Sequence, residues 1–401
     1  MLKNCCVPKR NGSKLKQNKV KQNKVKKNNI WIPAGLILLA LFLNLLGWLS
    51  EGFCDFYVHH IFPIWVATYG RVMGWFPFSV GELMLYAAAM IVAVLAMSIP
   101  FYLALRKKIP GKVKKCYAAF VKVVVWIFSV VCLIMTLNCF LLYHVSPLKE
   151  SHPMFTEKEA REYGLEEVEI LRNEIVLLSN YLAEQLERDD EGNLIYEKDM
   201  MIARAKQAMA SLGEEIPRLQ GFYPDPKPLW KSDFFSQQYI MGYYFPFSLE
   251  ANYNNMMCIG NYPATLCHEL SHLKGVMRED EAGFIGYLAC MEADDLFFNY
   301  SACLSVLTYV DNDFYRAIGE NDAYYKSMPA ISPLVKKDKQ FLTEETWKKV
   351  EEDAMLSTET VKKVSDTFTE TTLTLNGVSE GKISYSKVVD LLLVYYDGIL
   401  Y

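Results

Sequence analysis

Three long apolar stretches constrain this chain more than any other feature of its sequence. They cover residues 30–49, 83–105 and 117–143. Each has the roughly twenty apolar residues needed to cross a hydrocarbon core about 30 Å thick. The first follows a tail of 29 residues and precedes no small-residue cleavage site, so we expect an uncleaved anchor rather than a signal peptide. The sequence therefore predicts a membrane protein with three N-terminal transmembrane helices.

The distribution of Lys and Arg predicts how these helices are oriented. Residues 1–29 carry ten basic residues and no acidic one, residues 106–116 carry six, and residues 50–82 contain Arg71 alone. Basic segments beside membrane spans stay on the cytoplasmic side. We therefore expect a multi-pass protein of the cell membrane with a cytoplasmic N-terminus and an extracytoplasmic domain at 144–401.

The distribution of charged residues also limits which binding partners are expected. The formal net charge is −4, but 16 of the 42 basic residues lie in the tail and linker, which leaves an acidic exterior domain. A basic tail directly before a span is the usual orientation signal and is favoured over a nucleic-acid-binding arm. The expected partner is the lipid bilayer, with no nucleic acid.

Residues 50–82, between the first two spans, are rich in aromatic side chains. We expect an extracytoplasmic loop that lies partly in the membrane interface, where Trp and Tyr are favoured. Its two histidines, His59 and His60, are expected to lie in that interface rather than to bind a metal.

The domain after the third span has patterns of both helix and strand. Residues 155–188 open with a capping box, Thr156 and Glu159, and then repeat apolar residues at helical spacing. This predicts one long amphipathic helix. A second helix is expected over 198–213, and the prolines in 223–230 exclude a helix there.

Residues 237–255 carry the strongest strand pattern, with many aromatic residues in alternation and a proline at Pro246. Because proline lacks an N–H group, the strand is expected at a sheet edge, where an extended peptide can add itself as a further strand. Tyr243, Tyr244 and Phe245 are the candidates for this substrate-binding edge. A buried aromatic hairpin without a ligand is an equally open interpretation.

The segment NYPATLCHELSHLKG, residues 261–275, holds the motif with the clearest chemistry. A proline suits the first turn of a helix and a glycine its end, so the segment predicts a short helix. His268 and His272 lie four residues apart and project from one face, where both can bind a single ion. Glu269 beside them can reach a metal-bound water, which is the HExxH arrangement of zinc enzymes.

A carboxylate must complete this site, because no histidine follows His272. If residues 278–292 form a second helix, Glu279 shares its face with small residues that allow close packing against the HExxH helix. Glu281 shares its face with larger apolar residues, and Glu292 has a spacing known from thermolysin-like enzymes. We therefore rank the candidate third ligands Glu279, Glu281 and Glu292, in that order.

Four cysteines follow the last span: Cys258, Cys267, Cys290 and Cys303. Their flanks are apolar, and none of them forms a CxxC pair. Buried thiols are therefore favoured over disulfides or metal ligands.

Several sequence blocks together resemble a known family of bacterial membrane proteins, the domain of unknown function 3810. These blocks are GYYFPFSLEAN, TLCHELSHLKG, REDEAGF with YLAC, and GKISYSKVVDLLLVYY. The resemblance implies a mostly helical α+β, zincin-like domain of the gluzincin kind, with Zn²⁺ as its cofactor. The REDEAGF block also resembles the ExEAN segment that supplies the third ligand in ImmA-like metallopeptidases, which points to Glu279. Gly283 stands where that pattern has Asn.

These observations predict a membrane-anchored zinc endopeptidase that cleaves a peptide or protein substrate in the cell envelope. Glu269 is expected to take a proton from the attacking water, and a tyrosine is expected to stabilise the oxyanion. Tyr385 is our first candidate for that tyrosine, with Tyr243 and Tyr244 as alternatives. Two other functions stay open, namely an inactive zinc-binding receptor or scaffold and a sensor protease that relays a signal across the membrane.

Overall fold

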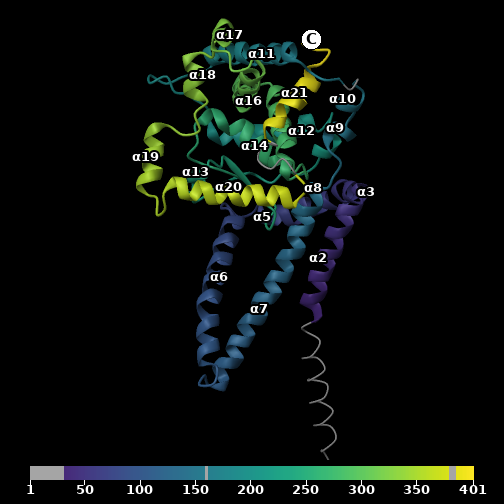
Figure 1. Cartoon of the computed structure of the whole chain (residues 1–401), viewed down its shortest axis with the longest axis vertical. Coiled ribbons are helices and arrows are strands. Elements are labelled where there is room, and N and C mark those ends of the chain that lie inside the picture. The colour runs from purple at the N-terminus through teal and green to yellow at the C-terminus, as the bar shows by residue number, and fades with distance from the viewer. Residues whose placement is uncertain (1–30, 159–160, 379–384) are drawn as a thin grey trace, which may run out of the picture.

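The computed structural model describes residues 31–158, 161–378 and 385–401. The basic tail at 1–29 and the first residue of the predicted first span lie outside these ranges. Figure 1 shows three long helices that leave a mostly helical domain on one side, with the C-terminus on the far side of that domain. This mostly helical architecture agrees with the sequence patterns.

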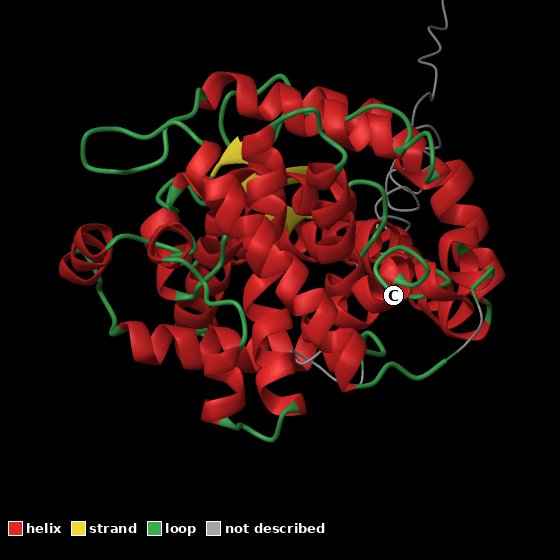
Figure 2. Cartoon of the chain, turned by 90° about the horizontal axis from the view of Figure 1, so that it is seen from above, coloured by secondary structure: helices red, strands yellow, loops and turns green. Residues whose placement is uncertain are grey.

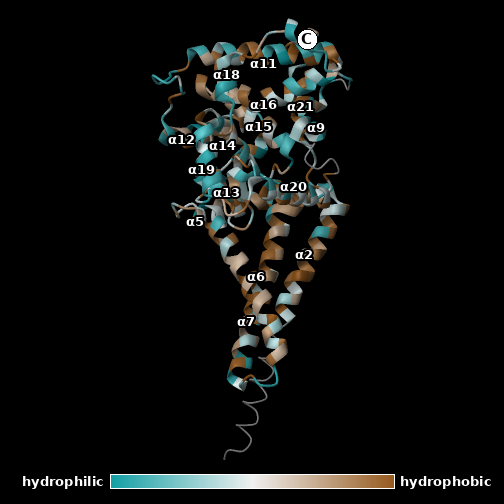
Figure 3. Cartoon of the chain, turned by 60° about the vertical axis from the view of Figure 1, so that its left-hand side comes forward, coloured by the Kyte–Doolittle hydropathy of each residue, from teal (hydrophilic) through white to brown (hydrophobic). Residues whose placement is uncertain are grey.

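Three long helices occupy the predicted spans and have the length and composition to cross a membrane. They are α2 (Trp31–Leu49), α6 (Val80–Leu105) and α7 (Gly111–Met135), which continues through a π-helical turn, Thr136–Phe140, into α8 (Leu141–Tyr143). Figure 3 shows that hydrophobic residues, in brown, predominate along these helices.

The spans leave large apolar side chains uncovered by protein. Phe42, Met90 and Phe128, one from each span, have 60%, 64% and 60% of their surface exposed. Burying a side chain of this kind is worth about 1.5–3 kcal/mol relative to leaving it in water. A hydrocarbon surrounding therefore suits these helices.

The predicted loop at 50–82 is instead largely helical. It contains α3 (Glu51–Phe56), α4 (Phe62–Trp65) and α5 (Arg71–Met73), joined by π-helical turns at Tyr57–Ile61 and Val66–Gly70. Val58, Phe62 and Val66, spaced four residues apart, are buried in the main core. The remaining aromatic residues hid this spacing in the sequence. His59 and His60 are exposed on this segment, and the His60 ring stacks on Phe56.

The predicted helix over 155–188 begins later than its capping box indicated. Helix α11 runs from Leu165 to Gln185, and the Gly164 N–H donates to Glu167 Oε2 at 2.8 Å. Thr156 belongs to the short helix α10 (Pro153–Thr156), and Glu159 lies outside the described residues. Lys158 lies between these two helices and donates to three backbone carbonyls, two in the last turn of α21 (Val388–Tyr396) and one just beyond it. These bonds hold the segment around Lys158 against the end of α21.

The centre of the domain is a group of buried helices. Helix α14 (Tyr262–His272) packs against α12 (Lys198–Leu212), α15 (Glu279–Met291) and α16 (Leu296–Ala317). The predicted helix over 198–213 is thereby confirmed. Three of the four cysteines are buried free thiols, and Cys258 is partly exposed.

A small three-stranded sheet lies beside these helices (Figure 2). Its strands are β1 (Lys227–Pro228), β2 (Gly242–Phe245) and β3 (Glu250–Tyr253), in the order β1-β3-β2. β1 pairs with β3 in parallel, and β2 pairs with β3 antiparallel. The predicted strand over 237–255 is thus a hairpin. Pro246 follows β2 directly, and β2 lies at the sheet edge, as predicted.

Hydrogen bonds join the sheet to the second span. The Glu250 carboxylate on β3 accepts from the Val80 and Gly81 N–H groups in the first turn of α6, at 3.2 and 2.6 Å. It also pairs with Lys227 on β1, and both side chains are buried. A carboxylate at a helix N-terminus satisfies free N–H groups and favours the helix dipole. The sheet is therefore fixed to the domain-side end of this span.

The remaining elements surround this core. The helices are α9 (Leu148–Ser151), α13 (Ser232–Gln237), α17 (Asp322–Ser327), α18 (Pro333–Asp338), α19 (Glu344–Glu352) and α20 (Thr358–Leu375), with 3₁₀ turns at Pro217–Leu219 and Ile259–Asn261. Helix α20 lies across the base of the domain in Figure 1, nearly perpendicular to the spans. Helix α11 lies on the opposite side.

Candidate metal centre

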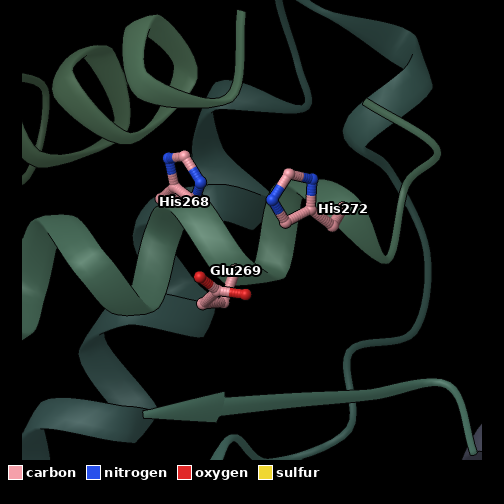
Figure 4. A group of neighbouring side chains, drawn as sticks. All are labelled: His268, Glu269 and His272. Atoms are coloured by element: carbon pink, nitrogen blue, oxygen red, sulfur yellow. The ribbon is translucent and has the colours of Figure 1, made fainter. Parts of the chain in front are cut away.

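Helix α14 presents the HExxH side chains in the interior of the domain. Pro263 lies in its first turn, and Gly275, with φ of 79°, ends the turn that follows it. His268 and His272 lie side by side on the helix with ring centroids 4.8 Å apart (Figure 4). Ligand-type atoms of these two residues and of Glu269 all lie within 4.8 Å of one another.

Glu279, in the first turn of α15, completes the cluster. Its Oε2 atom lies 3.1 Å from His268 Nε2 and 3.8 Å from His272 Nε2. The two helices approach closely at Gly286, where an added Cβ would come within 3.0 Å of the Ala264 carbonyl oxygen. The small residue predicted to allow close packing therefore does so. Two imidazole nitrogens and a carboxylate oxygen converge on one point.

The other two carboxylates proposed as ligands do not join this cluster. Glu281 Oε1 accepts from the Leu148 N–H at 2.7 Å, and burial raises the pKa of Glu281 to about 7, although the charge of Arg218 opposes this. Glu292 follows the last turn of α15, thirteen residues and roughly 20 Å of helix beyond Glu279. Of the three candidates, the structure brings Glu279 to the histidines.

A backbone carbonyl fixes the ring of His272. The Val276 carbonyl oxygen lies 2.6 Å from His272 Nδ1, and because a carbonyl only accepts, Nδ1 must carry the proton. The tight turn at Gly275 brings Val276 back to this position. The unprotonated Nε2 then faces Glu279, as in metal-binding histidines whose other nitrogen donates to a fixed acceptor.

Burial and the neighbouring charges shift the protonation of the cluster. Burial lowers the pKa of His272 to about 4, so its ring is neutral at pH 7. Burial also lowers the pKa of His268, but its hydrogen bond with Glu279 outweighs this and raises the pKa overall. Burial opposes ionisation of Glu279, yet the same hydrogen bond and both histidines hold its pKa below the ordinary value. The cluster therefore favours a positive charge beside the Glu279 carboxylate.

Glu269 has the most unusual surroundings in the cluster. It is 4% exposed, and among the residues that the structure describes no hydrogen-bond partner is found for its Oε2 atom. Burial raises the pKa of Glu269 to about 8. A buried polar atom without a partner costs about 1–3 kcal/mol, so this oxygen indicates a bound water, ion or ligand at this point.

Tyrosines surround the carboxylates. Tyr385 lies near both carboxylates, because it helps to lower the pKa of Glu279, and burial together with the charges of Glu279 and Glu269 raises the pKa of Tyr385. Tyr243 on β2 interacts with both carboxylates. The Tyr244 ring lies beside that of His272, with centroids 5.9 Å apart, but its hydroxyl donates to the Asn138 carbonyl at 3.0 Å. All three predicted tyrosines therefore lie near the centre, and the Tyr244 hydroxyl anchors the sheet to the third span.

The structure adds two tyrosines that the sequence did not indicate. Tyr143, at the end of the third span, and Tyr309, on α16, both interact with the charge of Glu279. They come from helices far apart in the chain. No local motif marks either residue, so only the fold reveals their position.

The strand β2 passes directly beside Glu269. A Cβ added at Gly242 would lie 2.5 Å from Glu269 Oε1, so the strand approaches this closely because the residue is glycine. Phe245, at the other end of the strand, is buried and packs against Leu229 and Phe235. It therefore anchors the strand, and its ring centroid lies 4.8 Å from that of Tyr243.

The outer edge of β2 pairs with no further strand among the described residues. The Asn254 N–H donates to the Met241 carbonyl, and in an antiparallel pair such bonded positions alternate. The backbone groups of Gly242 and Tyr244 therefore point away from β3. Within the described part of the chain, no hydrogen bond to these groups is found.

Comparisons with known proteins place the chain in a family. No curated protein and no solved structure matches it significantly. A family model described as "Protein of unknown function (DUF3810)" matches residues 57–393, which include every residue of the cluster. The resemblance seen in the sequence blocks is thereby confirmed. The chain belongs to the family of proteins of unknown function DUF3810.

Proposed function

We propose that this protein is a membrane-anchored, zinc-dependent endopeptidase of the gluzincin kind, with a zincin-like domain. The unpartnered oxygen of buried Glu269, beside two histidines and Glu279, carries this proposal. The donor set fits zinc, which takes imidazole nitrogen and carboxylate oxygen and keeps one position open in catalytic sites. His268, His272 and Glu279 would hold the ion.

Zinc bound there would act as a Lewis acid towards the peptide carbonyl and lower the pKa of a water towards about 7. The charge of a bound zinc ion would lower the pKa of Glu269, which burial alone raises, so that the carboxylate is ionised. Its free oxygen beside a ligand can then take the proton from the attacking water. It then delivers that proton to the leaving amine. Hydrolysis consumes one water as the C–N bond breaks, the hydroxyl joins the carbonyl carbon and the amine gains the proton.

A tyrosine hydroxyl stabilises the negative charge that develops on the carbonyl oxygen. Burial raises the pKa of Tyr385 well above its ordinary value, so the hydroxyl keeps its proton and can donate it. Tyr243, on β2, is the second candidate for this hydrogen-bond donor. Fixed donors of this kind contribute about 3–4 kcal/mol to related acyl-transfer reactions.

The open edge of β2 suits an extended peptide. Gly242 and Tyr244 offer backbone N–H and C=O groups to a further strand. The same strand passes Glu269 at Gly242. A peptide paired there would run past the general base, which supports the edge as the substrate-binding site.

The unpartnered oxygen also favours an enzyme over a scaffold. A structural zinc site needs its ligands and no further acceptor. Glu269, if it had no role in a reaction, would keep a buried oxygen without a partner at a cost in stability. We therefore prefer catalysis to an inactive zinc-binding receptor.

The direct test is hydrolysis by the purified full-length protein in proteoliposomes. We expect the zinc-loaded protein to cleave a degenerate mixture of unstructured peptides, to lose activity with a chelator and to regain it with zinc. Mass spectrometry of the products would report the cut sites. Zinc-loaded protein that cleaves none of these peptides would contradict the proposal.

Replacing Gly242 with alanine is expected to lower the cleavage rate by about a hundredfold. The new methyl group would displace the Glu269 carboxylate, and a misplacement of about 1 Å costs a rate factor of this order. Zinc content should not change, because the histidines and Glu279 are not touched. Gly283→Ala is the matched control, since an added Cβ there meets only Val388 at 3.8 Å. Equal activity of both variants would argue against a role for this approach.

We propose that the domain lies outside the cytoplasm, from the basic residues at 1–29 and 106–116. A reporter fused after Tyr401 should be active only outside the cytoplasm, and one inserted at residue 110 only inside it. Enzyme and fluorescent reporters with opposite compartment requirements would check both positions. The reverse pattern would put the HExxH helix in the cytoplasm and refute a role in the cell envelope.

A further inference from the structure

The candidate centre is attached to the domain-side ends of the spans. On β2, the Tyr244 hydroxyl donates to Asn138, and Asn138 Nδ2 donates to the Pro246 carbonyl at 2.9 Å. Asn138 lies in the last two turns of the third span, and Tyr143 at its end interacts with Glu279. No stalk separates the candidate centre from the level at which the spans enter the domain.

Helix α20 indicates where the membrane surface lies. Its residues Val364, Phe368 and Leu375 are 66%, 67% and 72% exposed, and their spacing puts them on one face. Gly377, just past this helix, lies against the Trp48 ring in the last turn of the first span. Helix α20 thus crosses the base of the domain beside the end of a span (Figure 1). Such a stripe suits the boundary between lipid headgroups and acyl chains.

An apolar pocket lies at the same base, beside the second span. It has a volume of about 540 Å³, and its lining includes Phe78, Leu83, Leu229 and Trp230. Leu83 is in the first turn of α6, so the pocket lies at the domain-side end of this span. Trp230 is 79% exposed, and tryptophan favours the membrane interface.

Apolar side chains connect this pocket to the open strand. Leu229, which lines the pocket, packs with Phe235 and Phe245. The ring centroids of Phe235 and Phe245 lie 5.9 and 4.8 Å from that of Tyr243. Tyr243 in turn interacts with Glu269. Buried, packed side chains thus link the pocket, which lies on the β1 side of the sheet, to Tyr243 beside the candidate centre.

We propose that the substrate is another polypeptide anchored in the same membrane, cleaved in the segment next to its anchor. This rests on the proposed peptidase function. Such a chain leaves the bilayer at the level of the pocket, which receives apolar residues at the end of its anchor. The following extended segment then pairs with the edge of β2 and passes Glu269. Confinement to the same membrane raises the effective concentration of this segment.

The test compares one cleavable tail in two forms. The tail is unstructured, of degenerate sequence and on the order of 60 residues long, which is about 200 Å when extended. One form carries a single membrane span and is reconstituted with the full-length protein, and the other form is free in solution. We expect about a hundredfold faster cleavage of the anchored form. The cuts should gather within roughly the first ten residues after the span, about 35 Å of extended chain.

Two variants test whether the pocket causes the faster cleavage of the anchored tail. Trp230→Ala should slow cleavage of the anchored tail roughly tenfold, the loss expected for truncating a tryptophan at a contact, and leave the free tail unaffected. Tyr181→Ala is the matched control, because Tyr181 is 60% exposed on α11, on the side of the domain away from the spans. It should change neither rate.

The outcomes separate this inference from the proposed function. Equal rates for both forms, with cuts spread along the whole tail, would refute the preference for anchored substrates and leave the peptidase intact. Absence of cuts in both forms by zinc-loaded protein would refute the peptidase itself. An anchored preference that Trp230→Ala does not change would refute the pocket as the binding surface.

Discussion

Replacing Glu269 with glutamine is expected to lower the rate of peptide cleavage by a factor of roughly a hundred to ten thousand, the usual contribution of a positioned general base. Glutamine keeps the shape of the side chain and removes its basicity. The residue follows a proposed ligand directly and keeps one oxygen free of partners. Zinc content and thermal unfolding should stay close to those of the wild type, because the proposed ligands are unchanged.

Glu292→Gln is the matched control for this variant. It makes the same change on an exposed carboxylate at the far end of α15, so cleavage should be unaffected. The Glu269→Gln result also separates an enzyme from a scaffold. If a deletion strain recovers fully with Glu269→Gln but not with His268→Ala, the metal matters and the catalysis does not.

The local sequence predicted the elements whose ends carry their own signals. The three spans follow from composition over about twenty residues. Helix α14 has a proline in its first turn and a glycine after its end, and α12 stops at Gly213. These signals act within a few residues of the chain, so tertiary packing does not override them.

Tertiary contacts decided the elements that the sequence did not predict. The helix α11 starts late because Lys158 binds carbonyls at the end of α21, more than 200 residues away. Residues 51–73 are helical because one side packs into the domain core, while their exposed aromatic residues hide the period. Contacts between residues far apart in the chain cannot be predicted from a local sequence pattern.

The candidate site likewise contains residues that the sequence predicted and residues that only the fold reveals. The HExxH residues are close in sequence, and the small residue at Gly286 indicated the face that carries Glu279. In contrast, Tyr143 and Tyr309 come from the third span and from α16, where nothing marks them as neighbours of a carboxylate. A site assembled from several helices is therefore visible in sequence only where one helix supplies most of it.

Removing a proposed ligand should have the second large effect. His268→Ala or His272→Ala should abolish zinc binding, since each removes one of the two imidazole donors that α14 supplies. Glu279→Ala should weaken zinc by more than the roughly 10–100-fold typical of losing a residue that only orients a ligand. Metal analysis and competition with a chromogenic chelator would measure both effects.

The choice of Glu279 over Glu281 is tested by Glu281→Gln. This substitution keeps an acceptor for the Leu148 N–H, so any loss of stability should be small while zinc binding persists. Acidification gives an independent check. Because the pKa of His268 is raised, its proton competes with zinc already near neutral pH, and zinc affinity should fall as the pH decreases. If Glu281→Gln empties the site while Glu279→Ala retains zinc, the contact of Glu279 with the two histidines is an ion pair and not part of a metal centre.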